Sequence, residues 1–290
     1  MSAGGAASPP AEAMRRGVSR GAFLATVVIV AIIMLAAGMY VGKTVFSSTS
    51  ASSKPLVVGT NLPFPPFESI GSTNNTYYGF DIDFARMIAD SMGRTAYFVN
   101  YADFSALLTD TGAGVLDMAA SAVTMSGFVG TQRNLTMSFS NPYYEANQAL
   151  LTKSSNSFMC PASGCTVANM STLKMGLQSG TSSEAWADAY LIPNETSGSV
   201  TTFTTVDTEV TALTAGALDA VMIDTGPAAQ IAAGSGGALH VAGIIHTGEL
   251  YGFVVQHNDP KGYLPVINSV IKQAMQNGTY QKLLTKWGLG

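Results

Sequence analysis

The fold is decided by residues 104–124, which read FSALLTDTGAGVLDMAASAVT. The first half predicts a helix, and after two glycines a strand is predicted around 116–120. Upstream, residues 56–61 (LVVGTN) form a short β-branched run that ends in a turn signal and predict another buried strand. Strands that alternate with helices indicate an α/β fold with a largely parallel sheet.

The same alternation starts again after residue 150, although no internal sequence repeat is detectable. Between the first two strands, residues 80–93 have apolar positions at helical spacing, with Asp81 as expected N-cap and Gly93 as the stop. After residue 150 the sequence first predicts a strand and turn over 173–180 and a helix over 181–191, opened by a Thr181-x-x-Glu184 capping box. A helix from about 207 to 215 and strands over 217–224 and 250–256 follow. The chain ends with a helix over 280–288, which is preceded by an amphipathic helix with the apolar stripe Val266, Ile267, Val270, Ile271, Ala274 and Met275.

Length and charge narrow the function classes. The chain has 290 residues, enough for one large or two moderate domains. Charged residues make up 11% of it and the net charge is -4. Nucleic-acid binding needs a basic patch, and the sequence has none, so nucleic-acid binding is discounted as a function.

Residues 22–41 carry no charge and are almost continuously apolar, long enough to span a bilayer as a helix. Arginines gather in 15–20, whereas only Lys43 follows closely. The positive-inside bias therefore predicts a single-pass protein of the cell membrane. Residues 1–21 would be cytoplasmic, 22–41 would be the transmembrane anchor, and the rest of the chain would be extracellular.

A cleaved signal peptide is the alternative interpretation, because Ala36-Ala37-Gly38 is a run of small residues near the end of the apolar stretch. No cysteine lies there, so the usual bacterial lipid-anchor site is absent. Residues 42–54 are mostly small and polar and predict a flexible linker.

The two cysteines, Cys160 and Cys165, are close in sequence, and in an exported chain they predict a disulfide. Metal binding is not expected, since two thiols without nearby histidines leave a zinc site incomplete.

A candidate binding segment covers residues 121–144, SAVTMSGFVGTQRNLTMSFSNPYY. Ser121, Thr124 and Ser126 precede a single arginine, Arg133. A guanidinium fits a carboxylate through two parallel hydrogen bonds, and neighbouring hydroxyl and N–H groups can supply further donors. The segment therefore predicts a pocket for a small carboxylic acid.

This segment resembles the hallmark of the extracellular solute-binding proteins for polar amino acids, bacterial family 3. In that family a Ser-Gly-x-Thr-x-Thr-x-x-Arg run precedes Phe-Ser-x-Pro-Tyr-Tyr. Further family-like segments occur in the family's order: PFPPFES (63–69), YYGFDIDFARMIA (77–89), the 104–124 stretch, LQSGTSSEA (177–185), TALTAGALDAVMIDTGPAA (211–229) and AMQNGTYQKLLTKWG (274–288).

The resemblance implies an α/β, two-lobed periplasmic-binding-protein-like fold of type II, with two crossing strands and a ligand cleft between the lobes. Lobe 1 would comprise 55–145 plus 247–290, and lobe 2 would comprise 146–246. The first crossing would follow Tyr144, and the second would lie near His246–Tyr251.

The family's site carries over onto residues of this chain. The ligand α-carboxylate would meet Arg133, and its α-ammonium would meet Asp224, for which a plain helix N-cap is the alternative. Phe64 and Phe104 would sandwich the aliphatic part, while the neutral amides of Asn61 and Gln178 point toward a neutral polar ligand. The other expected contacts at the carboxylate end are Ser121, the N–H of Ala122, Thr124, Thr181 and Ser182.

Two departures from the family pattern affect this end of the site. Ala122 stands where the family has glycine, and about four extra residues, GFVG at 127–130, lie ahead of Arg133. The insertion is a reason for Arg133 to be displaced.

The implied function is the capture of a polar amino acid and its delivery to the permease of an ABC importer. The protein would be monomeric and would need no cofactor or metal. One alternative is a sensor that reports the ligand without transport. The other is a dehydratase acting on a cyclic carboxylate, for which Glu68 and Glu145 are the nearest candidate acids; no enzymatic activity is expected.

Overall fold

The computed structural model describes residues 54–73 and 75–290. The predicted cytoplasmic segment 1–21, the anchor 22–41 and nearly all of the linker lie outside these residues. Among the described helices, none combines the length and the apolar character needed to cross a membrane.

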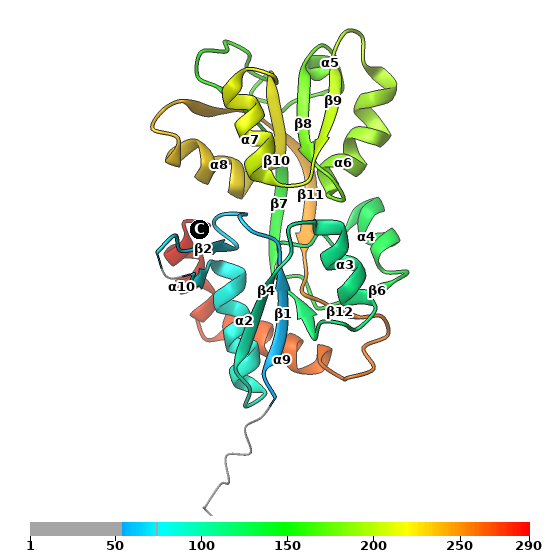
Figure 1. The fold of residues 1–290 in the computed structure, drawn as a ribbon, viewed down its shortest axis with the longest axis vertical. Coiled ribbons are helices and arrows are strands. Elements are labelled where there is room, and N and C mark those ends of the chain that lie inside the picture. Colours follow the sequence, from blue (N-terminus) through cyan, green and yellow to red (C-terminus); the bar gives the residue numbers. More distant parts are fainter. Residues whose placement is uncertain (1–53, 74) are drawn as a thin grey trace, which may run out of the picture. The chain divides into compact units, whose positions relative to one another are not determined.

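The first sheet has the strand order β4-β1-β5-β12-β6. Its strands are β1 (Leu56–Thr60), β4 (Ala96–Asn100), β5 (Met118–Ala119), β6 (Met137–Phe139) and β12 (Val254–Gln256). Helices α2 (Phe80–Ser91), α3 (Phe104–Gly112), α4 (Gly127–Arg133), α9 (Leu264–Gln276) and α10 (Thr279–Trp287) accompany it, with a small hairpin of β2 (Ser69–Ile70) and β3 (Tyr77–Tyr78) (Figure 1).

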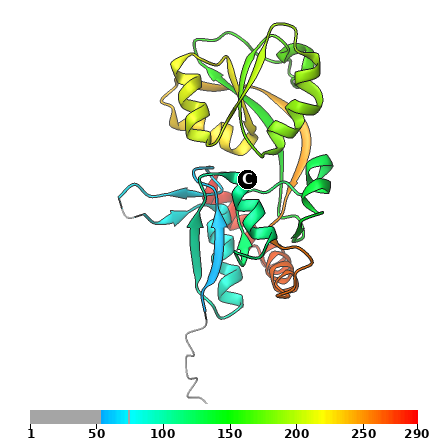
Figure 2. The same ribbon diagram turned by 45° about the vertical axis from the view of Figure 1, so that its right-hand side comes forward.

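The second sheet has the order β11-β7-β10-β8-β9. Its strands are β7 (Tyr144–Lys153), β8 (Lys174–Gln178), β9 (Ser199–Phe203), β10 (Ala220–Asp224) and β11 (Leu239–Tyr251). Around it lie α5 (Val167–Met170), α6 (Ser182–Trp186), a π-turn (Ala187–Leu191), a 3₁₀ turn (Ile192–Asn194), α7 (Val206–Ala215) and α8 (Thr225–Gly234) (Figures 1 and 2).

Both sheets are largely parallel, as predicted, but each is mixed, because one of its strands runs opposite to the others. In the first, β1 is parallel to β4 and β5, but β12 runs antiparallel to β5 and β6. In the second, β8 is parallel to β9 and β10, but β7 is antiparallel to β10 and β11. The antiparallel strands, β7 and β12, lie where the chain passes from one sheet to the other, a connection that helix–strand alternation does not reveal.

Strands β7 and β11 are the two passages, and they pair with each other from Tyr144↔Tyr251 to Leu239↔Lys153. The register shifts between Ile245 and Glu249, where β11 carries two more residues than β7. A bulge of this kind bends its strand and re-aims the next side chains. The predicted crossing positions agree with these strands, whereas the exact lobe boundaries stay a prediction.

Aromatic rings pack where the passages leave the first sheet. Phe67 meets Tyr144 and Tyr251 edge-on at centroid distances of 5.1 and 5.3 Å. Tyr143 stacks on Phe253 at 4.3 Å. All except Tyr144 are essentially inaccessible to solvent. This packing fixes the loop after β1, and hence the residues beside Phe67, against the crossing strands.

Two helix starts differ from their predictions. Helix α2 begins at Phe80 with Gly79 as its cap, so Asp81 lies inside the helix and is not its N-cap. Gly79 has φ 140, and a Cβ there would lie 2.0 Å from the carbonyl oxygen of Phe67, so this position needs glycine. Asp81 is free to use its carboxylate elsewhere, as described below.

The start of α6 is half of a capping box. Thr181 Oγ1 accepts from the N–H of Glu184, as predicted. The Glu184 carboxylate, however, accepts from the N–H of Gly180 and not from that of Thr181. The helix predicted over 181–191 runs from Ser182 to Leu191, but its α-helical hydrogen bonds end at Trp186 and the π-turn follows.

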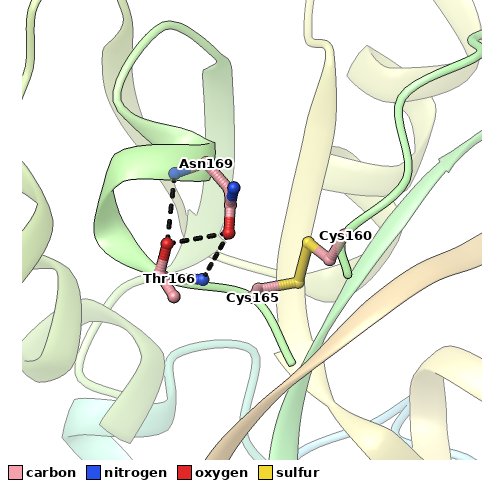
Figure 3. The surroundings of a disulfide bond; sticks show 4 residues. All are labelled: Cys160, Cys165, Thr166 and Asn169. Atoms are coloured by element: carbon pink, nitrogen blue, oxygen red, sulfur yellow. Dashed lines mark hydrogen bonds between the residues drawn. A yellow bond between two sulfur atoms is a disulfide. The ribbon is translucent and has the colours of Figure 1, made fainter. Parts of the chain in front are cut away.

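Cys160 and Cys165 form the predicted disulfide (Figure 3). The loop between them lies along β11, because Cys160 and Cys165 donate backbone N–H bonds to Ala242 and Ile244. Directly after it, Thr166 and Asn169 cap α5 reciprocally, as the dashed lines in Figure 3 show. The disulfide thus closes a short loop on the outer strand of the second sheet.

Candidate functional site

The structure brings all the residues that were predicted to bind the ligand to one small cavity. Its volume is about 20 Å³, room for roughly one water molecule. The walls come from loops and helix starts of both sheets. They consist of Asn61, Phe64, Glu68, Phe104, Ser121, Ala122, Thr124, Arg133, Gln178, Thr181, Ser182 and Asp224.

Arg133 is the last residue of α4, the helix that contains the insertion 127–130. Its side chain is buried, and its guanidinium donates to the carbonyl oxygens of Thr124 (2.8 Å) and Gly180 (2.9 Å). It also lies 5.5 Å from the ring centre of Phe104, a cation–π contact. The insertion therefore leaves the guanidinium at the cavity. None of the ion pairs found among the described residues includes Arg133.

Burial lowers the pKa of Arg133 to about 10, against which the charges of Glu249 and Asp224 act. A guanidinium with this pKa still carries its charge at neutral pH. A buried charge is costly unless it is paired, so the site favours an anionic partner for Arg133.

Asp224 ends β10, and its carboxyl accepts a hydrogen bond of 3.0 Å from Nε2 of Gln148. The residue occupies the N-cap position of α8, but its side chain makes no capping hydrogen bond. Burial, with the charge of Glu249 added, raises the pKa of Asp224 to about 8. The plain N-cap interpretation is thus not what the side chain does, and the carboxyl faces the cavity.

Two of the donors expected at the carboxylate end are engaged within the chain. The N–H of Ala122 donates to Asp81 at 2.7 Å, which corrects the expectation that this N–H is available to a ligand. The hydroxyl of Ser121 donates to Oε1 of Glu68 at 2.8 Å. Both residues still line the cavity, but their protons serve buried carboxyl groups.

Thr124 and Ser182 lie across from each other, with their hydroxyl oxygens 3.3 Å apart. Both donate to one oxygen of Glu249, at 2.7 and 2.6 Å. The other Glu249 oxygen accepts from Gln148 Nε2 at 2.9 Å. Thr181 is engaged too, since its hydroxyl donates to the carbonyl of Gln178.

Glu249 and Gln148 were not predicted as site residues. Each lies on a crossing strand, Gln148 on β7 and Glu249 at the end of the β11 bulge. The sequence located the crossings, but which of their side chains turn inward depends on the bulge register. The only signal in the sequence was that both residues lie near the predicted crossings, and it does not tell which side chains face the site.

The two amides pair with each other across the cavity. Gln178 Nε2 donates to Asn61 Oδ1 at 2.9 Å and to the carbonyl of Thr204 at 3.0 Å. The Asn61 amide group donates to the carbonyl of Tyr101 at 2.7 Å. Their donors are therefore largely used by the chain.

Phe64 and Phe104 are both buried and both line the cavity. Phe104 begins α3, whose N-cap Asp103 accepts from the N–H groups of Ser105 and Ala106. Phe64 lies in the loop held by Phe67, and its ring centre is 6.3 Å from that of Phe67. They supply two apolar walls, as predicted.

Glu68, named from the sequence only as a candidate acid for the enzymatic alternative, adds a buried carboxyl group to the cavity. It is 1% exposed, and its Oε2 has no hydrogen-bond partner among the described residues. Burial first, and then the charge of Asp81, raises the pKa of Glu68 well above its usual range. Asp81 itself, which accepts from the Tyr143 hydroxyl, has its pKa raised to about 7 by burial.

Comparison with known proteins agrees with this architecture. The family model of the bacterial extracellular solute-binding proteins, family 3, matches residues 56–290. The chain belongs to this family. The resemblance predicted from the sequence is thereby confirmed.

Relatives with curated names are binding proteins. The chain is 26% identical over 247 residues to the ABC transporter arginine-binding protein 1 of Escherichia coli K12, covering 83% of this chain and 94% of that protein. It is 25% identical to the L-cystine-binding protein of the same organism, covering 80% and 82%. These names bear out the prediction that the chain is not an enzyme.

Solved structures give the same picture. An ancestral arginine-binding protein bound to arginine has a TM-score of 0.71 and 27% identity, covering 81% of this chain and 99% of that one. An ancestral amino-acid-binding protein, described as a precursor of cyclohexadienyl dehydratase, has a TM-score of 0.68 and 29% identity, covering 80% and 94%. The two-lobed periplasmic-binding-protein-like fold predicted from the sequence is confirmed.

The buried carboxyl groups predict how stability depends on pH. Asp81 and Asp224 have folded-state pKa values of about 7 and about 8, whereas in the unfolded chain they lie near 4. From about pH 4 to pH 8 the folded protein therefore holds more protons, so its free energy of unfolding falls as the pH rises. We expect Asp224→Asn to be more stable than the wild type at pH 8 by at least about 1.4 kcal/mol, one pKa unit.

Urea unfolding of residues 54–290 without ligand, at pH 5 and pH 8, measures this difference. Asp188→Asn is the matched control, because Asp188 is an exposed aspartate of the second sheet's side. An equal loss of stability between the two pH values in Asp224→Asn and in the wild type would contradict the assignment.

Proposed function

We propose that the protein captures a polar amino acid in this cavity and delivers it to the permease of an ABC importer. The observation that carries the proposal is the opposition of Arg133 and Asp224 in one buried cavity. A zwitterionic amino acid has one anionic and one cationic end, and each needs a partner when it is desolvated. Family membership and the names of the relatives support the same class of ligand and partner.

In this proposal the ligand carboxylate takes the place of the Thr124 and Gly180 carbonyls at Arg133. The α-ammonium meets Asp224, and ionisation of that carboxyl accompanies binding. Phe64 and Phe104 cover the aliphatic part. Each of these contacts is a proposal for this chain.

Ligand entry requires the cavity walls to separate, because the present volume holds little more than a water. Hydrogen bonds between Gln178 and Asn61, and between Arg133 and Gly180, join the two sides. A ligand that contacts both sides would stabilise the closed arrangement over an open one, a hinge-type population shift. The same closure would serve a sensor, so transport and sensing share this step.

A cationic side chain suits the cavity better than the neutral one suggested by Asn61 and Gln178. The amides are largely paired with each other and with backbone, whereas Glu68 has a buried oxygen without a partner. A guanidinium or ammonium at Glu68 would satisfy that oxygen, and the two phenylalanine rings suit a planar cation. Relatives named for arginine are in line with this class.

We further propose that the binding protein is monomeric and stays on the outer face of the cell membrane through residues 22–41. The support is the uncharged apolar run and the arginines ahead of it. A tether would keep the ligand-loaded protein near the importer. A cleaved signal peptide remains the alternative.

If Arg133 and Asp224 hold opposite ends of the ligand, Arg133→Ala and Asp224→Asn should each weaken amino-acid binding by roughly 2–5 kcal/mol. This is the range for removing one partner of a desolvated charge pair. Calorimetric titration with L-arginine and L-glutamine measures this. Arg86→Ala and Asp188→Asn are matched charge controls, since Arg86 lies on α2 with a 42% exposed side chain and Asp188 is exposed. Affinities within a few-fold of wild type for both site variants would contradict the proposed function.

The Glu68 subsite predicts a change in selectivity. We expect Glu68→Gln to weaken L-arginine binding by about 2 kcal/mol, because a buried hydrogen bond between charged groups contributes roughly 1.5–3 kcal/mol. L-Glutamine binding should change much less, because its side-chain amide is uncharged and forms no charge–charge contact with Glu68. An equal loss for both amino acids, in parallel titrations, would show that Glu68 only supports the fold of the loop.

The anchor predicts that the full chain remains in the membrane pellet after alkaline extraction of cells that express it. Alkaline treatment removes peripheral proteins but not membrane-spanning helices. Recovery of a soluble form whose N-terminus lies between about residues 38 and 50 would instead identify a cleaved signal peptide.

A further inference from the structure

Glu249 holds donors that the proposed ligand would need. It lies at the end of the β11 bulge and is 6% exposed. Its Oε2 accepts the hydroxyl protons of Thr124 and Ser182 at 2.7 and 2.6 Å. Its Oε1 accepts from Gln148 at 2.9 Å. One carboxylate of the chain is thus surrounded by three donors.

These hydroxyls are the ones expected at the ligand carboxylate. A hydroxyl has a single proton to donate, so a proton given to Glu249 is not available to a ligand. Arg133, the expected cation at that end, also lies in the field of Glu249. In this structure the chain's own carboxylate therefore takes the two hydroxyl protons that the ligand carboxylate would need.

A groove on the far side of Thr124 and Ser182 offers Glu249 another place. The groove has a volume of about 640 Å³. Thr124 and Ser182 line both the cavity and the groove, whereas Glu249 lines only the groove and not the cavity. Its remaining walls include Phe128 of the insertion helix and Trp186 of α6. The carboxylate can therefore leave the hydroxyls without crossing the packed core.

We propose that Glu249 is an affinity-determining residue that competes with the ligand carboxylate for the hydroxyl groups of Thr124 and Ser182. Amino-acid binding then requires Glu249 to release the two hydroxyls and turn toward the groove. This inference rests on the proposed function, because it needs a ligand carboxylate at Arg133. It predicts an effect opposite in sign to that of a ligand-binding residue, whose loss weakens binding.

The test is calorimetric titration of residues 54–290 with L-arginine and L-glutamine. The Glu249→Gln variant keeps the shape of the side chain and removes its charge. Hydrogen bonds to a charged group contribute more than those to a neutral one, so we expect Glu249→Gln to bind the amino acid about tenfold more tightly. Glu145→Gln is the matched control, because Glu145 is an exposed glutamate on the other crossing strand, and it should leave the affinity within about twofold.

A second background separates competition from a general charge effect. In a Thr124→Val, Ser182→Ala protein, Glu249 and the ligand carboxylate have no hydroxyl groups to compete for. Most of the gain in affinity from Glu249→Gln should therefore vanish in that protein. Should Glu249→Gln not fold, Glu249→Asp tests the same point, since the shorter side chain withdraws the carboxylate and should also tighten binding.

The outcomes are distinguishable. Wild-type binding with an unchanged or weaker Glu249→Gln overturns the competition and leaves the proposed function intact. A gain that persists in full without the two hydroxyls also overturns it. If neither the wild type nor Glu249→Gln binds any amino acid, the proposed function fails and the competition fails with it.

Discussion

The structure depends on one electrostatic constraint: the buried guanidinium of Arg133 lines a small cavity together with the carboxyl groups of Glu68 and Asp224. A third carboxyl group, that of Glu249, accepts from two hydroxyls of the cavity wall, and all four side chains are less than a tenth exposed. Burying unpaired charges is costly, so carboxyl groups in such a place tend to take up protons. This explains why burial raises the pKa of Asp224 and Glu68 while Arg133 remains a cation. A ligand with both charges would pair the guanidinium and one of the carboxyl groups, so the same cost that reduces stability provides part of the driving force for binding.

The crossing strands transmit this constraint between the two sheets. β7 contributes Gln148 and β11 contributes Glu249, and Gln148 Nε2 donates to both Glu249 and Asp224. The orientation of the Gln148 amide is fixed by Ser183, whose hydroxyl donates to its oxygen at 2.7 Å. One amide on a crossing strand therefore contacts both carboxyl groups.

The sequence predicted the site better than it predicted the local geometry. Motif order placed Arg133 and Asp224 on the same cavity although they are far apart in the chain, because Arg133 ends α4 and Asp224 ends β10, and the fold dictates the positions of both ends. It failed for Asp81, where Gly79 and not a side chain starts the helix, and for the donors, because which acceptor takes a hydroxyl proton depends on distances of a few tenths of an ångström. Glu249 was missed for a related reason. Its direction is set by a bulge in β11, and a bulge leaves no clear mark in hydrophobic periodicity.

The structure accommodates both departures from the family pattern at the carboxylate end of the site. Ala122 has φ 45, a conformation that costs a non-glycine residue roughly 1–2 kcal/mol. The hydrogen bond from its N–H to Asp81, itself held by the Tyr143 hydroxyl, keeps the backbone in that conformation and consumes the N–H. The insertion 127–130 forms the turns of α4 that carry Arg133 to the cavity and place Phe128 on the groove. With the Ala122 N–H engaged, a ligand carboxylate has fewer backbone donors and depends more on Arg133, Thr124 and Ser182. Two of these groups, the hydroxyls of Thr124 and Ser182, donate to Glu249. The engaged N–H of Ala122 therefore makes the proposed competition by Glu249 more consequential for affinity than it would be beside a residue whose N–H was free.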